Sequence, residues 1–236
     1  MPNWVINKLS FEGDEKRVEE LMNQISTDEE LIDFQKIIPR PKSLDITSGA
    51  MTELGYDLVL HLENGDSTNL RKRYSFSKNI DKPFDIWVND FLKDEKIEST
   101  LEAGRIALEN EKLYGHRDRY SWSIENWGTK WNTSQSYLCK DEIVLETAWS
   151  NPYPVILQLS QNFPDLLIKL RFADESIGDN WGEYHLKNNE VVFQREYDEV
   201  ESCVLWGYDP VEMFDHMKRD KNINEILEDD NTDSSL

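Results

Sequence analysis

Hydrophobic and polar residues at the start of the chain alternate as a half-buried strand requires, over residues 4–11. Apolar residues at helical spacing follow over 14–26, and the carboxylate of Asp14 can cap such a helix by accepting from first-turn amides. An apolar run over 31–38 predicts a second strand, which Pro39 ends because proline cannot donate to a ladder. The N-terminal pattern therefore predicts a strand, a helix and a strand.

The middle of the chain, residues 42–115, has helical patterns instead. We expect a weakly specified helix over 52–62 and a second helix whose first turn begins at Pro83, where a missing amide costs little. A third helix is predicted over 97–114, with Gly115 as its end.

Apolar runs in the second half predict five strands, at residues 120–124, 142–149, 166–172, 181–186 and 191–195. A short helix is expected at 155–163, with Pro152 and Pro154 in its first turn. The order is that of two βαβ-like units on either side of an insertion. It predicts an α+β protein with a ferredoxin-like split βαβ sheet, helices on one face, a mostly helical insertion and a C-terminal extension.

This order also predicts the domain boundaries. We expect residues 1–41 and 116–197 to form a discontinuous ferredoxin-like core, and residues 42–115 to form the insertion. Residues 198–236 form an acidic extension, which we expect to fray from about residue 220 because it is too polar to bury.

Targeting signals and cysteine usage both favour the cytosol of a cell. No apolar run approaches the ~20 residues that a membrane helix needs, and the N-terminus lacks the pattern of a signal peptide. Cys139 and Cys203 are far apart in the sequence, so two thiols are expected, with a disulfide left open. We therefore predict a cytoplasmic protein without a membrane partner.

The chain has a net charge of −21, and residues 196–236 carry thirteen Asp or Glu against three Lys or Arg. Such a chain repels phosphate backbones, so direct binding of nucleic acid is not expected. Two interpretations remain open. The carboxylates form a solvated acidic surface, or they mimic a nucleic acid and occupy a basic groove on a partner protein.

Three tryptophans, Trp122, Trp127 and Trp131, fall within ten residues, and Trp149 follows soon after. Tryptophan is costly to expose, so the cluster indicates a core or a binding surface. In the structural interpretation the segment is a wide turn between strands, and Gly128 takes an unusual backbone angle.

In the functional interpretation the same segment is a polar and aromatic binding surface. Lys130 supplies a cation, two asparagines form hydrogen bonds with a ligand through their amides, and the tryptophan rings stack on that ligand or on a peptide. The candidate residues are Asn126, Trp127, Thr129, Lys130, Trp131, Asn132 and Trp149. The structural interpretation predicts that Trp127 and Trp131 are largely buried, whereas ring faces open beside Lys130 favour the functional one.

Four segments of the chain together form a family pattern. They are Met-Pro-Asn-Trp-Val-Ile-Asn7, Leu101-Glu-Ala-Gly-Arg through Gly115 into Trp122, Asn126-Trp-Gly-Thr-Lys-Trp-Asn132 with Thr147-Ala-Trp-Ser150, and Phe172-Ala-Asp-Glu-Ser-Ile-Gly178 with Asn180 and Gly182. Together these segments resemble the YubB-like, ferredoxin-like family of phage, plasmid and integrated-element proteins. The resemblance covers roughly residues 1–197, with one departure at Asn151, where the family usually reads Ser-Pro-Pro. It implies a ferredoxin-like fold and a mobile-element origin, and it implies no activity.

Sequence motifs for catalysis or metal binding are missing. The chain has no His-Glu-x-x-His, Cys-x-x-Cys, phosphate loop or Gly-x-Ser-x-Gly motif, although a triad assembled from distant residues stays open. Oxygen side chains around Gly178 could hold a hard cation, but their spacing is more typical of a polar turn: Asp174, Glu175, Asp179 and Asn180. We predict no cofactor, metal or catalytic residue.

These observations favour a non-enzymatic accessory protein of a mobile element that binds or inhibits a host or rival protein, with nucleic-acid mimicry as one mode. The alternative is a small-molecule or nucleotide-binding protein or enzyme, with its pocket near Trp127, Lys130 and Trp149. A single-strand nucleic-acid binder is a third hypothesis, which the net charge disfavours.

Overall fold

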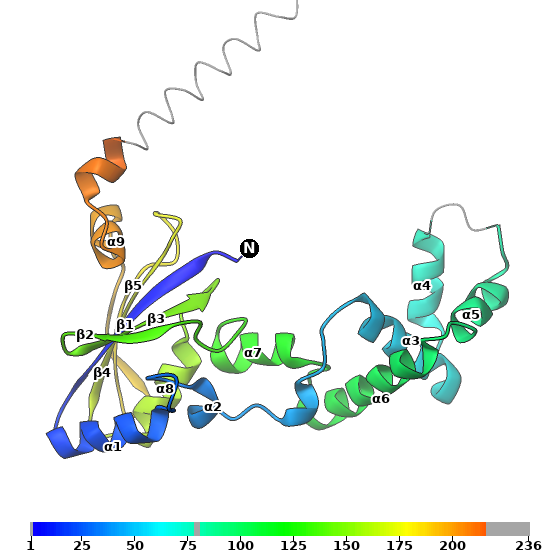
Figure 1. Ribbon diagram of the computed structural model, residues 1–236, viewed down its shortest axis with the longest axis horizontal. Helices are drawn as coiled ribbons and strands as arrows, with labels where there is room; N and C mark the ends of the chain where they lie inside the picture. The colour runs from blue at the N-terminus through cyan, green and yellow to red at the C-terminus, as the bar shows by residue number, and fades with distance from the viewer. Residues whose placement is uncertain (1, 78–80, 216–236) are drawn as a thin grey trace, which may run out of the picture. The chain divides into compact units, whose positions relative to one another are not determined.

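The computed structural model describes residues 2–77 and 81–215 (Figure 1). It divides into two compact units, one formed by the chain up to Ile38 and from Trp127 onward, the other by Pro39–Asn126. The second unit begins three residues before the predicted insertion and ends eleven residues after it. The predicted fraying from about residue 220 lies outside the described residues.

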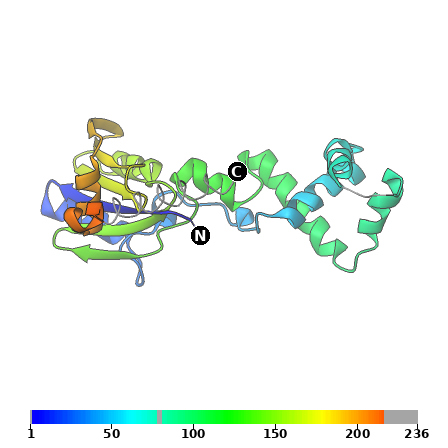
Figure 2. The same ribbon diagram turned by 90° about the horizontal axis from the view of Figure 1, so that it is seen from above.

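The first unit is built on a six-stranded antiparallel sheet with strand order β2-β3-β1-β4-β5-β6. Figure 2 shows the same strands after a quarter turn. Strand β1 lies between β3 and β4 and runs antiparallel to both. Because helix α8 connects β3 to β4, these two strands and β1 form a split βαβ unit, which confirms the α+β, ferredoxin-like prediction. The strands are β1 (Trp4–Glu12), β2 (Ser136–Cys139), β3 (Glu142–Ala148), β4 (Leu167–Asp174), β5 (Gly182–Lys187) and β6 (Glu190–Arg195).

Helices of the first unit pack against both faces of this sheet, so the prediction of helices on one face is wrong in this detail. On one face, Tyr153 of α8 (Tyr153–Asn162) lies edge-on to Tyr184, which stacks on Phe172. On the other face, Leu205 of α9 (Glu199–Trp206) joins a buried cluster with Ile6 and Ala173. The C-terminal extension therefore contributes an ordered helix to the sheet.

The N-terminal helix α1 (Glu15–Ile25) begins where the sequence predicts, because the Asp14 carboxylate accepts hydrogen bonds from the amides of Lys16 and Arg17. The strand predicted over 31–38 is wrong. The structure has a short helix there, α2 (Phe34–Ile37), and the Asp33 side chain caps it by accepting from the amide of Gln35.

The strand predicted over 120–124 is also wrong, because helix α7 (Arg119–Trp127) occupies this segment. The Asp118 carboxylate caps the helix by accepting from the amides of Tyr120 and Ser121. Trp122 and Ser123 are both buried, although they are adjacent in the sequence. Adjacent buried positions belong to a helical stripe and not to the alternation of a strand.

The second unit is helical, with η1 (Lys42–Leu44), α3 (Ala50–Asn64), α4 (Thr68–Phe76), α5 (Phe84–Leu92) and α6 (Ile97–Tyr114). Helices α3 and α6 cross in close contact at two glycines. A Cβ on Gly104 would lie 2.2 Å from the carbonyl carbon of Gly55, so the backbones could not approach this closely with larger residues. The helices predicted at 52–62, 83 onward and 97–114 are confirmed.

Candidate binding surface

The segment Asn126–Asn132 turns from α7 back toward the sheet, and Trp127 anchors it. The side chain of Trp127 is 1% exposed, its indole N–H donates to the carbonyl of Ile38 at 2.9 Å, and its ring meets Phe34 edge-on. Gly128 follows with φ of 77°, and a Cβ there would lie 2.6 Å from Cδ of Pro154. Burial of Trp127 is therefore confirmed, and the glycine is required both by its angle and by its neighbour.

The polar candidates of the same segment hold the turn together. Thr129 is buried, and its hydroxyl donates to the carbonyl of Ala148 at 2.8 Å. Asn132 accepts from the amide of Phe34 at 3.0 Å and donates to the Asp33 carboxylate at 2.6 Å. The Asn126 amide donates within α7. These three side chains satisfy groups of the fold, so they follow the structural interpretation.

Trp131 and Trp149 have partly open rings, and Lys130 lies beside both. The Lys130 ammonium is 4.7 Å from the ring centroid of Trp131 and 4.4 Å from that of Trp149, within cation–π range. Trp131 is 39% exposed and Trp149 is 42% exposed. The prediction that Trp131 is largely buried is therefore wrong. We call Trp4, Lys130, Trp131 and Trp149 the tryptophan surface, since Trp4 packs 6.1 Å from Trp131.

Trp149 is held in an unusual backbone conformation. Its φ is 74°, a left-handed value that side chains with a Cβ rarely adopt. Its amide donates to the carbonyl of Asn3 at 2.9 Å, and its own carbonyl accepts from the Asn180 side chain at 3.2 Å. Strained residues of this kind cluster at functional sites, where the surrounding fold determines their position.

Asn180 belongs to the acidic turn that the sequence suggested as a cation site. The Asp174 carboxylate accepts from the amide of Ser176 at 2.8 Å, and Glu175 accepts from the amide of Trp4 at 3.0 Å. Burial raises the pKa of Asp174 above its ordinary value. Among residues 2–77 and 81–215, no group of three or more His, Cys, Asp or Glu side chains is placed to hold a metal ion.

A cleft of about 460 Å³ opens beside this turn, at the end of strands β4, β5 and β6. Asn151, two residues after Trp149, is one of its walls and is 8% exposed. This cleft is not the pocket predicted near Trp127, Lys130 and Trp149, because none of these three residues lines it. The residues that line the cleft are Asn151, Phe172, Asn180, Trp181, Tyr184, Gln194, Arg195 and Glu196.

Strands β2 to β6 and helices α8 and α9 fall in a stretch that matches a known family, whereas β1 lies outside it. Residues 126–221 match a family described as "Ferredoxin-like domain in Api92-like protein". We refer to this stretch as the Api92-like region. Its ferredoxin-like description agrees with the split βαβ sheet, and the YubB-like name and mobile-element origin stay predictions.

Among solved structures, the chain is similar to a protein api92 from Yersinia pseudotuberculosis. The two chains are 13% identical, the match covers 84% of this chain and 98% of that one, and the TM-score is 0.38. No curated protein matched the chain. No helix among the described residues is long and apolar enough to cross a membrane.

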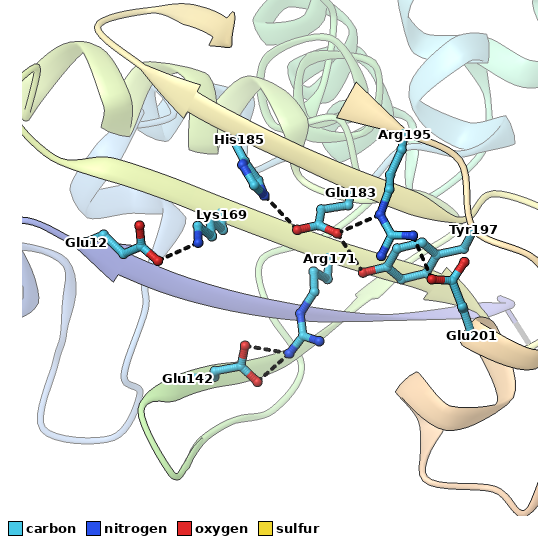
Figure 3. A network of polar contacts seen from close by, with 9 residues as sticks. All are labelled: Glu12, Glu142, Lys169, Arg171, Glu183, His185, Arg195, Tyr197 and Glu201. Carbon is cyan, nitrogen blue, oxygen red and sulfur yellow. Dashed lines mark hydrogen bonds and ion pairs between the residues drawn. The ribbon is translucent and has the colours of Figure 1, made fainter. Parts of the chain in front are cut away.

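The sheet of the first unit also carries a charged network that the sequence did not predict (Figure 3). Glu183 of β5 lies at its centre, with His185 at 2.6 Å and the Arg195 guanidinium at 3.1 Å. Burial alone raises the pKa of Glu183, but the hydrogen bonds from His185 and Arg195 outweigh it and lower the pKa below its usual value. Arg171 of β4 binds the Glu142 carboxylate of β3 at 2.5 Å.

Lys8 of β1 lies on the same face as Arg171, its register partner on β4. Burial and the neighbouring Arg171 charge lower the pKa of Lys8. The network could not be predicted from the sequence because its members come from five strands, β1 and β3 to β6, and from Glu201 of α9. Charged residues are so common in this chain that spacing alone could not select these.

Several basic residues of the second unit pair with carboxylates. Arg73 pairs with the buried Asp57, Lys82 with Asp90, and Arg117 with Glu53 and Glu111.

Proposed function

We propose that this protein is a non-enzymatic binding protein that holds a protein partner on the tryptophan surface. The observation that carries the proposal is the position of the Lys130 ammonium between two partly open tryptophan rings. Tryptophan is enriched among the interface residues that contribute most to affinity, because a large ring loses little conformational freedom on binding. A cation–π contact of about 0.5–1 kcal/mol at an exposed site also fixes the rings in place.

The charge of the chain defines the chemistry of the partner. With a net charge of −21, the protein is attracted to a basic surface and repelled by a phosphate backbone. A basic protein that handles DNA or RNA fits this requirement, and mimicry of a nucleic acid is the mode of binding that the charge favours. An origin in a phage or other mobile element, and inhibition of a host or rival protein, are supported by the YubB-like resemblance only.

The alternative pocket bounded by Trp127, Lys130 and Trp149 receives less support. Trp127 and Thr129 are both 1% exposed, so neither can touch a ligand without opening the turn. Trp131 and Trp149, by contrast, are already accessible. The arrangement therefore favours a surface that meets a partner over an enclosed pocket at these residues.

The test is capture of a partner by the full chain and by two variants. The double variant Trp131→Ala, Trp149→Ala removes the rings. Tyr137→Ala removes a 51% exposed aromatic ring of β2 and serves as the matched control. We expect a basic protein to bind the wild type and the control, to dissociate at high salt, and to be lost from the double variant.

Each ring that is central to such an interface contributes about 2 kcal/mol or more, roughly 30-fold in Kd. The partner identified in this way is then purified and its Kd measured for all three chains. Equal Kd values for the wild type and the double variant would contradict the proposal.

A further inference from the structure

Helix α9 and the sheet beneath it border a groove on the face that carries the charged network (Figure 3). One part, of about 250 Å³, lies between α9 and the side chains of Lys8 and Arg171. An adjoining part, of about 330 Å³, extends over the neighbouring strands. The two parts share Arg171, Arg195 and Tyr197 as walls, so we treat them as one groove and call it the α9 groove.

The wall that α9 contributes to this groove is apolar and open. Val200 and Val204 lie one helical turn apart and are 48% and 58% exposed. Leu205, which also lines the groove, is buried in the cluster that fixes α9 on the sheet. The two valines therefore offer apolar surface that a further segment could cover with a gain in stability.

The sheet contributes an excess of cations. The charged side chains of the groove are four cations and three carboxylates, namely Lys8, Lys169, Arg171 and Arg195 against Glu142, Glu183 and Glu201. In a chain with a net charge of −21, such a local excess of positive charge attracts an acidic segment.

Lys8 is the cation with the least compensation. Among the residues that the structure describes, it has no ion-pair partner, and its register partner on β4 is Arg171. Like charges on neighbouring strands repel each other. Burial and this repulsion together lower the pKa of Lys8. A carboxylate placed beside Lys8 would offset both effects.

The C-terminal segment of the chain has the chemistry that complements both walls. Residues 222–236 contain five Asp or Glu and no Lys, Arg or His. Ile226 and Leu227 come directly before the run Glu228-Asp-Asp230. One short segment therefore offers apolar side chains for the valines of α9 and carboxylates for Lys8.

This segment is attached to the wall of the groove itself. Residues 206–221 join Leu205 to it, and a chain of that length spans up to roughly 50 Å when extended. Such a tether gives an effective concentration of about 1 mM. An acidic peptide from another protein would have to reach a similar concentration to compete, so the chain's own segment is the favoured occupant.

We propose that residues 222–236 of the same chain dock in the α9 groove, with their apolar side chains against the valines of α9 and their carboxylates beside Lys8. Docking closes this face of the sheet to other acidic ligands. No residue of the tryptophan surface lines the groove, so the contact goes beyond the proposed function and does not depend on it.

The test uses the full chain with a spin label on Cys139 and nuclear magnetic resonance of the amides of residues 222–236. Cys139 is exposed and Cys203 is buried, so a thiol reagent reacts selectively at Cys139. The label lies beside the groove, because Cys139 is the register partner of Glu142.

We expect the label to broaden the amide signals of residues 222–236. With an intrinsic Kd of about 0.1 mM, about nine tenths of the chains are docked at the effective concentration of the tether. High salt should restore the signals, because it screens the attraction between the carboxylates and the groove.

Two pairs of variants connect the broadening to the proposed contacts. The double variant Ile226→Ser, Leu227→Ser should weaken docking at least about tenfold, whereas Val211→Ser, which removes a 71% exposed valine outside the segment, should not. Lys8→Met should also reduce the broadening, and Lys36→Met, at an exposed lysine of α2, should leave it unchanged.

Three results would overturn the proposal. The first is that the label leaves the signals of residues 222–236 unchanged at low salt, as fraying predicts. The second is equal broadening in the wild type and in the double variant. The third comes from a mixture of spin-labelled chain with isotope-labelled chain that carries no spin label. Broadening of the same strength in this mixture would assign the groove to the segment of a second copy.

Discussion

Trp149 offers a test of whether the fold holds the tryptophan surface under strain. Its φ of 74° places a residue with a Cβ in the left-handed region. This conformation costs an L-residue roughly 1–2 kcal/mol, whereas glycine adopts it freely. The two variants Trp149→Ala and Trp149→Gly lose the same indole ring, so the comparison between them isolates the backbone.

The expected difference follows from two opposing terms. Glycine relieves the strain of about 1–2 kcal/mol, but its unfolded chain gains freedom that costs roughly 0.5–1 kcal/mol relative to alanine. Trp149→Gly should therefore be more stable than Trp149→Ala by about 0.5–1 kcal/mol, the reverse of the usual order in strands and helices.

Urea unfolding of the two variants, monitored by circular dichroism, measures this difference through the transition midpoint. An exposed control pair, Val192→Ala and Val192→Gly on β6, should show the usual order, with alanine the more stable. If alanine is also the more stable at position 149, the strain does not exist and the argument from backbone geometry fails.

Three further predictions concern the fold around these sites. Gly104→Ala should destabilise the second unit by about 1–3 kcal/mol in urea unfolding, because the new Cβ would meet the Gly55 backbone at 2.2 Å. This loss should exceed the gain from the higher helix propensity of alanine. An unchanged unfolding midpoint would contradict the close crossing of the two helices. Thr129→Val should cost about 1–3 kcal/mol, because the Ala148 carbonyl loses its donor while the shape is kept, whereas Thr133→Val at an exposed hydroxyl should cost less. The pKa of Glu183 is lowered in the fold, so ionised Glu183 stabilises the protein at pH values above its ordinary pKa of 4.5, and this contribution disappears as the pH falls through the lowered pKa. The difference in unfolding free energy between the wild type and Glu183→Gln should therefore shrink in acid. A difference that grows in acid would refute the assignment.

The sequence predicted the long elements of the fold well, for reasons visible in particular residues. Strand β1 and helix α1 have strong periodicity and a cap at Asp14, and both occur as expected. The segments 31–38 and 120–124 were short apolar runs whose pattern fits a strand or a helix equally. In the structure Asp33 and Asp118 cap helices at these segments, so the capping residues indicate the secondary structure better than the apolar pattern does.

Strand β2 could not be predicted because its pattern is weak. Tyr137, Leu138 and Cys139 are all exposed at the edge of the sheet, so no buried face marks the strand. The tryptophan segment likewise has one part that the sequence predicts and one part that it does not. Burial of Trp127 followed from its place beside a glycine turn, while exposure of Trp131 depends on how β1 and β3 bring Trp4 and Trp149 beside it.

The cleft was beyond sequence reasoning for a different reason. In the sequence, Asn151 is distinguished only as a departure from the YubB-like pattern. It becomes a wall of the cleft only because β4, β5 and β6 bring Phe172, Tyr184 and Gln194 to the same place. Contacts between residues distant in sequence set the site, and no local spacing records them.

The central claim is that Lys130, Trp131 and Trp149 form the contact surface for a basic protein partner. The most direct measurement is the Kd of that partner, once identified, for the wild type, for Trp131→Ala with Trp149→Ala, and for Tyr137→Ala. We predict a loss of at least about 30-fold for the double variant, with the wild-type Kd retained by the control. A double variant that is folded and binds as tightly as the wild type would contradict the claim.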